Sequence, residues 1–84
     1  MNKRAPSLIV YSRAYCHLCD DMIEALRRLQ EQIDFELEVV DVDSDARLEA
    51  RYGERVPALV AAGVELCHYR LDLAKVNEYL SKIG

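Results

Sequence analysis

The sequence predicts one α/β domain over residues 1–84, with a mixed four-stranded sheet and helices on both of its faces. Two observations carry this prediction. A β-forming run, a helical pattern and a second β-forming run follow one another near the N-terminus, which is a βαβ unit. A hairpin pattern and a final helical stripe then complete the order β-α-β-α-β-β-α. The chain has 84 residues, 51% of them hydrophobic, so it can fill one compact core and leaves little area for a second.

The βαβ unit occupies the first half of the chain. Residues 7–11 are rich in β-forming residues and show no helical stripe, so they read as a strand buried on both faces. A loop follows over residues 12–15, and residues 35–42 form the second β-rich run. The helix between them begins near Cys16, and its apolar residues recur at three- and four-residue steps: Leu18, Met22, Leu26, Leu29 and Ile33. A helical connection implies parallel strands and a right-handed crossover.

The second half predicts a short helix, a hairpin and a last helix. Asp43 or Ser44 caps the short helix, and Gly53 is placed to end it. Residues 58–61 and 65–69 read as the two strands of a hairpin, joined by a tight Ala-Gly turn. The last helix carries an apolar stripe: Leu73, Val76, Leu80 and Ile83.

Composition and charge narrow the classes of partner and compartment. A net charge of −4 disfavours a nucleic-acid partner, because neutralising phosphates requires a basic face. The apolar run over residues 8–11 is too short for the core of a signal peptide, and no stretch reaches the roughly 20 apolar residues of a membrane span. We therefore expect a cytoplasmic protein with no membrane partner. Its three cysteines are an odd number, so they do not all pair within the chain.

The residues most informative about chemistry are the two cysteines of Cys16-His17-Leu18-Cys19, which follow the first strand of the βαβ unit. At a helix N-terminus, unpaired N–H groups and the positive end of the dipole favour a Cys16 thiolate over the thiol. Cys19 lies one turn along the same helix face, close enough to attack a mixed disulfide on Cys16. The pattern therefore predicts disulfide exchange, with Cys16 as the nucleophile and Cys19 as the resolving thiol.

Two segments of the chain resemble the glutaredoxins: residues 11–19, Tyr-Ser-Arg-Ala-Tyr-Cys-His-Leu-Cys, and Arg55-Val56-Pro57. The resemblance covers nearly the whole chain and is strongest to small glutaredoxin-like proteins with a Cys-His-Leu-Cys-Asp motif. It implies a thioredoxin-like, glutaredoxin-type fold and a thiol-disulfide oxidoreductase of electron transport and cell redox homeostasis. It also implies a cis-proline at Pro57 that faces the dithiol, and a Val56 backbone that pairs with the peptide part of a thiol substrate.

The same resemblance implies the partners, and two departures modify them. The expected substrates are disulfide-containing proteins or glutathione mixed disulfides, with no bound cofactor and with glutathione as a co-substrate. His17-Leu18 replaces the usual Pro-Tyr between the cysteines, which removes an aromatic residue that helps to hold glutathione. Residues 69–71, Tyr-Arg-Leu, replace the usual glycine pair and put bulk where a ligand's terminal carboxylate would approach the backbone. Asp72, which also contributes to the cap of the last helix, matches the family's polar residue there.

Several residues around the dithiol are candidates for substrate binding, each with a simpler alternative. Arg13 and Arg55 would supply positive charge for a substrate carboxylate, or are solvated surface residues. A protonated His17 would favour the neighbouring thiolate, or this histidine is only an exposed residue at the helix start. Tyr15, together with Tyr11, lines the site or packs against the fold.

Other assignments remain open for the third cysteine and for the function. Cys67 is a small buried apolar residue or a third redox thiol. Cys16, Cys19, Cys67 and His68 include the ligand types of a zinc site, but adjacent residues on a strand point to opposite faces, so no metal site is predicted. The sequence thus favours a monomeric oxidoreductase that uses the Cys16/Cys19 dithiol. The alternative is a non-catalytic module that holds a partner in its cis-proline groove or through a cysteine-bound metal.

Overall fold

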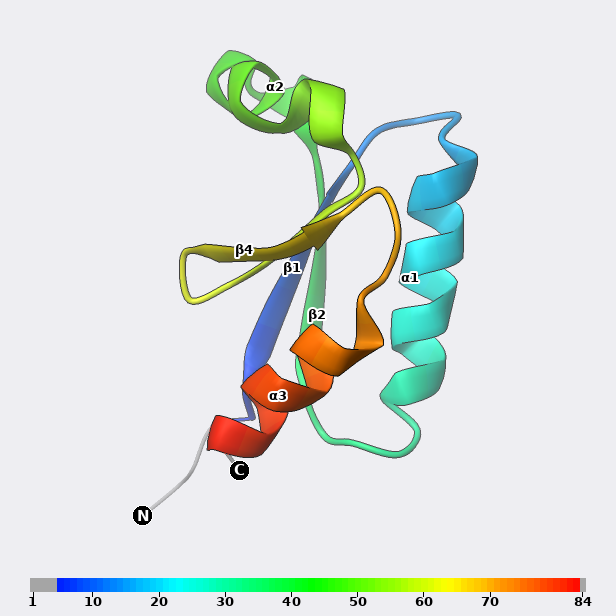
Figure 1. Ribbon diagram of the computed structural model, residues 1–84. Helices are drawn as coiled ribbons and strands as arrows, with labels where there is room; N and C mark the ends of the chain where they lie inside the picture. Colours follow the sequence, from blue (N-terminus) through cyan, green and yellow to red (C-terminus); the bar gives the residue numbers. More distant parts are fainter. Residues whose placement is uncertain (1–4, 84) are drawn as a thin grey trace.

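Figure 1 shows the protein as a computed structural model that describes residues 5–83. Its elements follow the predicted order. They are β1 (Ser7–Ser12), α1 (His17–Leu29), β2 (Glu36–Asp41), the 3₁₀ turn η1 (Val42–Ser44), α2 (Ala46–Tyr52), the 3₁₀ turn η2 (Gly53–Arg55), β3 (Ala58–Ala61), β4 (Val64–His68) and α3 (Leu73–Ile83). None of the helices in the described part is both long enough and apolar enough to cross a membrane.

The four strands form one mixed sheet in the order β2-β1-β3-β4. β1 and β2 are parallel, in register from Ser7 opposite Glu36 to Ser12 opposite Asp41, as the helical crossover requires. β3 runs antiparallel to both β1 and β4. The predicted mixed four-stranded sheet is therefore confirmed.

Strand alternation divides the core between the two faces of this sheet. Leu8 and Val10 of β1 point to the face that α1 and α3 cover (Figure 1), and they belong to a buried cluster: Leu8, Val10, Met22, Leu26, Phe35, Leu59, Ala61, Val76 and Leu80. On the other face, Tyr52 of α2 is buried with Val42, Ala58 and Val60. Helices thus pack on both faces, as predicted.

Helix α1 is shorter than its apolar pattern predicts, because it ends at Leu29 and not near Ile33. The side-chain amide of Gln30 donates to the carbonyl of Phe35 at 2.9 Å, which closes a tight turn after the helix. Ile33 still packs against the core, but it does so from that turn. The apolar residues therefore continue at helical spacing for one turn beyond the end of the helix.

The cap of α2 also differs from the prediction. Asp45 is the N-cap, and its carboxylate accepts the N–H of Arg47 at 2.8 Å. Asp43 and Ser44 lie one step earlier, in η1, where the carboxylate of Asp41 caps the turn. In a run with this many acidic residues, several side chains satisfy the local cap chemistry, and only the fold selects one of them.

Strand β4 contains a bulge that the sequence did not predict. Cys67 lies opposite Leu59 of β3, whereas Glu65 lies opposite Val60, so Leu66 is an extra residue in β4. Leu66 and Cys67 consequently both pack against the cluster on the α1 and α3 face. As a result, the β4 residues that precede the bulge lie on the opposite face of the sheet from the one that a regular strand would give them.

The last helix keeps only part of its predicted stripe. Val76 and Leu80 of α3 are buried, as expected, whereas Leu73 is exposed at the first helical position. The side chain of Ile83 lies outside the described part of the chain.

Candidate active site

Three loops meet at one end of the sheet. Tyr11, near the end of β1, lies opposite Ala58 at the start of β3, and Ala58 lies opposite His68 at the end of β4. The loop after β1, the segment before β3 and the loop after β4 therefore share this end. They carry Cys16, the proline that precedes Ala58, and residues 69–72. The strand register thus brings these three segments to one end of the sheet.

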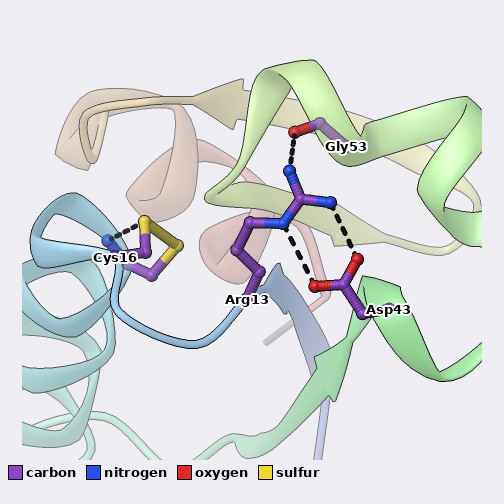
Figure 2. Close-up of a disulfide and its surroundings, with 5 residues drawn as sticks. Arg13, Cys16, Asp43 and Gly53 are labelled. Carbon is purple, nitrogen blue, oxygen red and sulfur yellow. Dashed lines mark hydrogen bonds and ion pairs between the residues drawn. A yellow bond between two sulfur atoms is a disulfide. The ribbon is translucent and has the colours of Figure 1, made fainter.

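The two cysteines of the motif occupy different environments at the start of α1. Cys16 is the N-cap residue, and its Sγ accepts the N–H of Cys19 at 3.2 Å. A disulfide joins Cys16 to Cys19, with their Cα atoms 5.2 Å apart (Figure 2). Cys16 is half-buried, whereas Cys19 is 0% exposed. Cys16, at the helix terminus, is thus the more exposed of the two cysteines, and Cys19 is shielded.

The side chains around Cys16 are unusually open. Tyr15 is 104% exposed and adopts a left-handed backbone conformation, with φ at 58°. His17 is exposed at the first position of α1. Leu18, which the apolar stripe placed on the buried face, is 40% exposed. These residues lie beside the disulfide in sequence and in space, and their roles in substrate binding stay predictions.

The peptide bond between Val56 and Pro57 is cis, as the family resemblance implied. Pro57 is fully buried, and Val56 is half-buried in an extended conformation with φ at −72° and ψ at 142°. The carbonyl of Val56 accepts no backbone hydrogen bond from the residues that the structure describes. An extended backbone acceptor is therefore left unpaired at the end of the sheet that carries the disulfide.

Tyr69 makes contacts that the sequence analysis missed. Its backbone is left-handed, with φ at 65°. Its N–H donates to the carbonyl of Pro57 at 2.8 Å, and its hydroxyl donates to the carbonyl of Glu54, also at 2.8 Å. Tyr69 thereby holds both ends of residues 54–57, called here the cis-proline segment. The only signal in the sequence was that a tyrosine begins the stretch that replaces the family's glycine pair.

The same loop faces the dithiol motif across a shallow depression. Residues 69–71 and Leu18 line a hollow of about 190 Å³, together with Asp21 and Met22. Leu18 stands between the two cysteines in sequence, whereas neither cysteine lines the hollow. Its walls are mostly apolar, with one acidic and one basic side chain.

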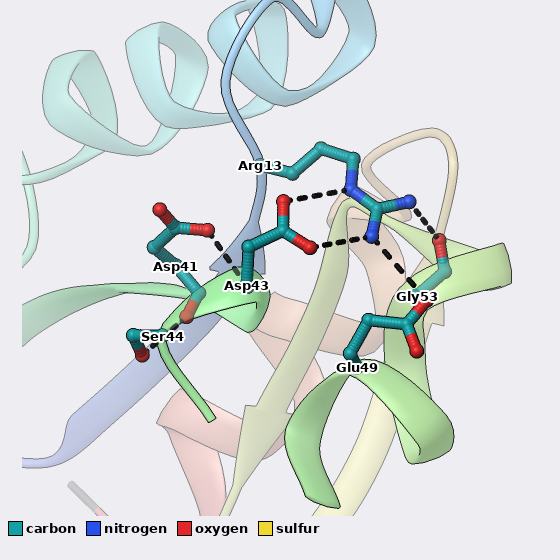
Figure 3. Close-up of polar contacts among 6 residues, drawn as sticks. All are labelled: Arg13, Asp41, Asp43, Ser44, Glu49 and Gly53. Atoms are coloured by element: carbon teal, nitrogen blue, oxygen red, sulfur yellow. Dashed lines mark hydrogen bonds and ion pairs between the residues drawn. The ribbon is translucent and has the colours of Figure 1, made fainter. Parts of the chain in front are cut away.

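Arg13, predicted to bind substrate, is engaged within the fold. Its Nε and Nη2 donate to the carboxylate of Asp43 at 3.2 and 2.8 Å, and its Nη1 donates to the carbonyl of Gly53 at 3.1 Å (Figure 2). Nη2 also lies 3.4 Å from Glu49 (Figure 3). The hydrogen bonds between Arg13 and Asp43 lower the pKa of the carboxyl and raise the pKa of the guanidinium. Its role toward substrate stays a prediction.

Arg55 is also bound within the fold, through a cluster that the bulge creates. Its Nη2 donates to the carbonyl of Arg51 at 2.9 Å and lies 3.4 Å from the carboxylate of Glu65. The other oxygen of Glu65 lies 2.8 Å from Nδ1 of His68. In a regular strand, residues three apart point to opposite faces, so this contact requires the extra residue in β4. Substrate binding by Arg55 stays a prediction.

Asp72 caps α3, as predicted. Its Oδ1 accepts the N–H of Lys75 at 3.1 Å, and its own N–H donates to Sγ of Cys67 at 3.4 Å. Cys67 is a half-buried free thiol that packs against the core, and burial raises its pKa. Within residues 5–83, no three His, Cys, Asp or Glu side chains are arranged to hold a metal ion.

The sheet order, the dithiol at the start of α1 and the cis-proline together define a protein of the thioredoxin fold. Thioredoxin from Schistosoma mansoni superimposes with a TM-score of 0.70, covering 99% of this chain and 83% of that one. The two sequences are 20% identical, so this likeness shows the fold alone. The predicted fold class is confirmed, and the fold together with the Cys16–Cys19 disulfide fits a redox role.

Residues 7–81 match the family model described as Glutaredoxin-like domain (DUF836), and the chain belongs to this family. The solution structure of protein Ne2328 from Nitrosomonas europaea is 46% identical, with a TM-score of 0.83, and the match covers 95% of this chain and 98% of that one. The X-ray structure of protein XcR50 from X. campestris is 37% identical, with a TM-score of 0.71, over 89% of this chain and 96% of that one.

Proposed function

We propose that this protein is a thiol-disulfide oxidoreductase that reduces disulfides of proteins, or mixed disulfides with glutathione, through Cys16 and Cys19. The observation that carries the proposal is the asymmetry of the pair: the accessible Cys16 caps a helix N-terminus, and the buried Cys19 is its disulfide partner. A purely structural disulfide carries no charge for the helix dipole to stabilise. An attacking thiolate gains stability from the N–H of Cys19 and from the helix dipole.

In the first step, the Cys16 thiolate of the reduced protein attacks one sulfur of a substrate disulfide. A bond forms between Cys16 Sγ and that sulfur, the substrate S–S bond breaks, and the second substrate sulfur leaves as a thiolate that takes up a proton. In the second step, Cys19 loses its proton and attacks Cys16 Sγ, which releases the first substrate sulfur as a thiolate. The substrate has then gained two electrons, and the protein carries the Cys16–Cys19 disulfide found in the structure.

Two molecules of a low-molecular-weight thiol return the protein to its reduced form. The first thiolate attacks the accessible Cys16 sulfur and frees Cys19, and the second attacks the resulting mixed disulfide, which yields a low-molecular-weight disulfide and the dithiol. Glutathione is the thiol that the family likeness suggests, as a co-substrate and with no bound cofactor. We expect it to bind weakly, because residues 69–71 add bulk beside the dithiol.

The proposed partner is a disulfide-containing polypeptide. The unpaired carbonyl of Val56 supports this choice, since an extended acceptor can pair with a peptide N–H of the substrate. A dithiol that donates electrons works in a reducing compartment, so we propose that the protein acts in the cytoplasm, as a monomer. Its net charge of −4 makes a nucleic acid an unfavourable partner.

The test is the reduction of a peptide whose single cysteine is joined by a disulfide to thionitrobenzoate, a chromophoric thiol. We expect the reduced wild-type protein to release thionitrobenzoate, and the Cys16→Ser variant to release none. The Cys19→Ser variant is expected to stop at a mixed disulfide between Cys16 and the peptide, because the resolving thiol is absent. Absorbance measures the release, and mass spectrometry identifies the trapped species.

The matched control is Cys67→Ser, which removes the third thiol and leaves the helix terminus intact. We expect it to exchange at the wild-type rate, because Cys67 lies on β4 and packs against the core. Full activity in Cys16→Ser would overturn the dithiol mechanism. If the reduced wild-type protein itself releases no thionitrobenzoate, the non-catalytic binding module becomes the better description of the protein.

A further inference from the structure

Tyr69 combines a strained backbone with two hydrogen bonds, and that combination points to a function. A bulky residue with φ at 65° is disfavoured by its own Cβ, and glycine would adopt this conformation without cost. Such strain persists only where surrounding contacts enforce it. The hydrogen bond from the Arg70 N–H to the His68 carbonyl, at 2.7 Å, closes a turn across Tyr69, and the Tyr69 ring contacts the His68 ring edge-on. Beyond its neighbours, Tyr69 makes the N–H bond to Pro57 and the hydroxyl bond to Glu54.

The two bonds have different requirements. The N–H bond to Pro57 extends the β3–β4 ladder by one residue, and any residue except proline could supply it. The hydroxyl bond to the carbonyl of Glu54 needs a side chain of the length of tyrosine, because Glu54 lies at the far end of the cis-proline segment. That carbonyl belongs to η2, whose last turn leaves acceptors without a partner in the turn itself. The phenol is therefore what tyrosine adds over glycine at this position.

We propose that Tyr69 is a positioning residue, which fixes the cis-proline segment so that the Val56 backbone is held ready for the polypeptide part of a substrate. The inference rests on the proposed function. Val56 lies between the two anchored carbonyls, at Glu54 and Pro57, and its own carbonyl has no backbone partner among the described residues. A segment held at both ends loses little freedom when a substrate pairs with its centre, so less binding energy is spent on ordering it.

The experiment compares two disulfides that share one leaving group. The first is the peptide disulfide with thionitrobenzoate. The second is the symmetrical disulfide of thionitrobenzoate, which has no peptide group to pair with Val56. For Tyr69→Phe, which loses only the hydroxyl, we expect KM for the peptide disulfide to rise about 5-fold, the equivalent of one neutral hydrogen bond. The kcat for this substrate and the rate with the symmetrical disulfide are expected to stay at the wild-type level.

Two further variants serve as controls. Tyr79→Phe removes the hydroxyl of a half-buried tyrosine of α3 and is expected to leave both substrates unchanged. Tyr69→Gly relieves the left-handed strain and is expected to fold at least as well as the wild type, yet to raise KM for the peptide disulfide at least as much as Tyr69→Phe. Hydrogen exchange of the Arg55 and Val56 amides, which needs no activity, is expected to accelerate in both Tyr69 variants.

The possible failures are distinguishable. If the wild-type protein releases thionitrobenzoate from neither compound, the proposed function fails, and the role inferred for substrate binding fails with it. If the wild type is active and Tyr69→Phe has the same KM for the peptide disulfide as the wild type, only the positioning role is wrong. An equal loss by Tyr69→Phe on both disulfides also overturns that role, because the symmetrical compound does not use Val56. Unchanged amide exchange in both Tyr69 variants would show that the hydroxyl does not hold the segment.

Discussion

Arg13 shows how a charged side chain beside a reactive pair can be committed to the fold. Its planar guanidinium forms a two-point contact with Asp43, which is the strongest geometry for such a pair, and its remaining nitrogen bonds the Gly53 carbonyl (Figure 3). The loop after β1 is thereby tied to η1 and to the end of α2. A lysine could not make these contacts together, because it is a point charge on a flexible stem.

We expect the contribution of this pair to stability to depend on pH. The hydrogen bonds to Arg13 lower the pKa of Asp43 in the folded protein. A lowered folded pKa stabilises the fold above the unfolded pKa of about 3.9, and this stabilisation is lost as the pH falls through the folded value. Asp43→Asn is therefore expected to lower the urea midpoint at neutral pH, and the difference from the wild type is expected to shrink below about pH 4.

The control for that prediction is Asp34→Asn, which changes an exposed carboxylate in the turn after α1. It removes the same charge, and it is expected to leave the midpoint nearly unchanged at either pH. Urea unfolding followed by circular dichroism measures both variants. A difference between Asp43→Asn and the wild type that is as large at about pH 3 as at neutral pH would contradict the prediction.

At the residue scale, the sequence could identify the chemistry but not the backbone that presents it. Cys16 and Cys19 follow from spacing and helix position, and both occupy the predicted places. Tyr15 and Tyr69 both adopt left-handed conformations, and nothing in their residue type indicates this, since glycine and asparagine are the usual signals. The hydrogen bonds that Tyr69 makes to Glu54 and Pro57 join residues distant in sequence, so local patterns cannot reveal them.

At the scale of elements, Asp72 at the start of α3 is both the cap of the helix and a predicted substrate-binding residue. The carboxylate of Asp72 accepts the N–H of Lys75, so this side chain already has a structural role. Replacing an N-cap aspartate by alanine costs about 1 kcal/mol, whereas asparagine caps nearly as well. Asp72→Ala is therefore expected to lower the free energy of unfolding by about 1 kcal/mol, and Asp72→Asn by a few tenths.

This pair of variants also separates capping from substrate binding. Asp72→Asn keeps the cap and removes the charge, so a slower reduction of the peptide disulfide by a protein of unchanged stability would assign the charge to substrate binding. Urea unfolding and the release of thionitrobenzoate provide the two measurements. Equal destabilisation by alanine and asparagine would contradict the capping role that the hydrogen bond to Lys75 indicates.

Periodicity predicted the elements and failed where an element changes its period. The strands and helices all occur in the predicted order, and the repeat is clearest in β1, whose residues alternate between buried and more exposed positions, and in α1. Leu66 breaks the repeat of β4, and the bulge brings Glu65 and His68 to one face. The sequence of β4 has no glycine to mark the bulge, so local sequence patterns could not predict the Arg55–Glu65–His68 cluster.

At the scale of the whole molecule, the site is a consequence of topology. The antiparallel β3 begins beside the end of β1 from which the chain enters α1, and β4 ends there as well. The family likeness implied that the Arg55-Val56-Pro57 segment faces the dithiol, and the strand register places both at one end of the sheet. The cis bond at Pro57 came from the family likeness and not from spacing. The engagement of Arg13 by Asp43 depends on side-chain packing, so it required the structure.

Helix α1 contributes residues both to this site and to the core. Two of its leucines, one at each place, allow the two contributions to be measured separately. Leu26 is 0% exposed in the cluster on the α1 and α3 face, whereas Leu18 is 40% exposed beside the disulfide. Both leucines lie within the same helix, so replacement by alanine changes the same atoms and nearly the same helix propensity. Any difference between the variants in stability therefore reports burial.

We expect Leu26→Ala to lower the free energy of unfolding by about 2 to 5 kcal/mol, because it removes buried methyl groups and leaves a cavity. A core of this size supplies only about 3 to 5 kcal/mol in total, so this substitution is expected to remove a large part of the stability of the fold at 25 °C. Leu18→Ala is expected to cost about 1 kcal/mol or less and to act on the peptide disulfide instead. Urea unfolding of both variants measures the difference, and equal destabilisation would mean that Leu18, despite its exposure, supports the core as Leu26 does.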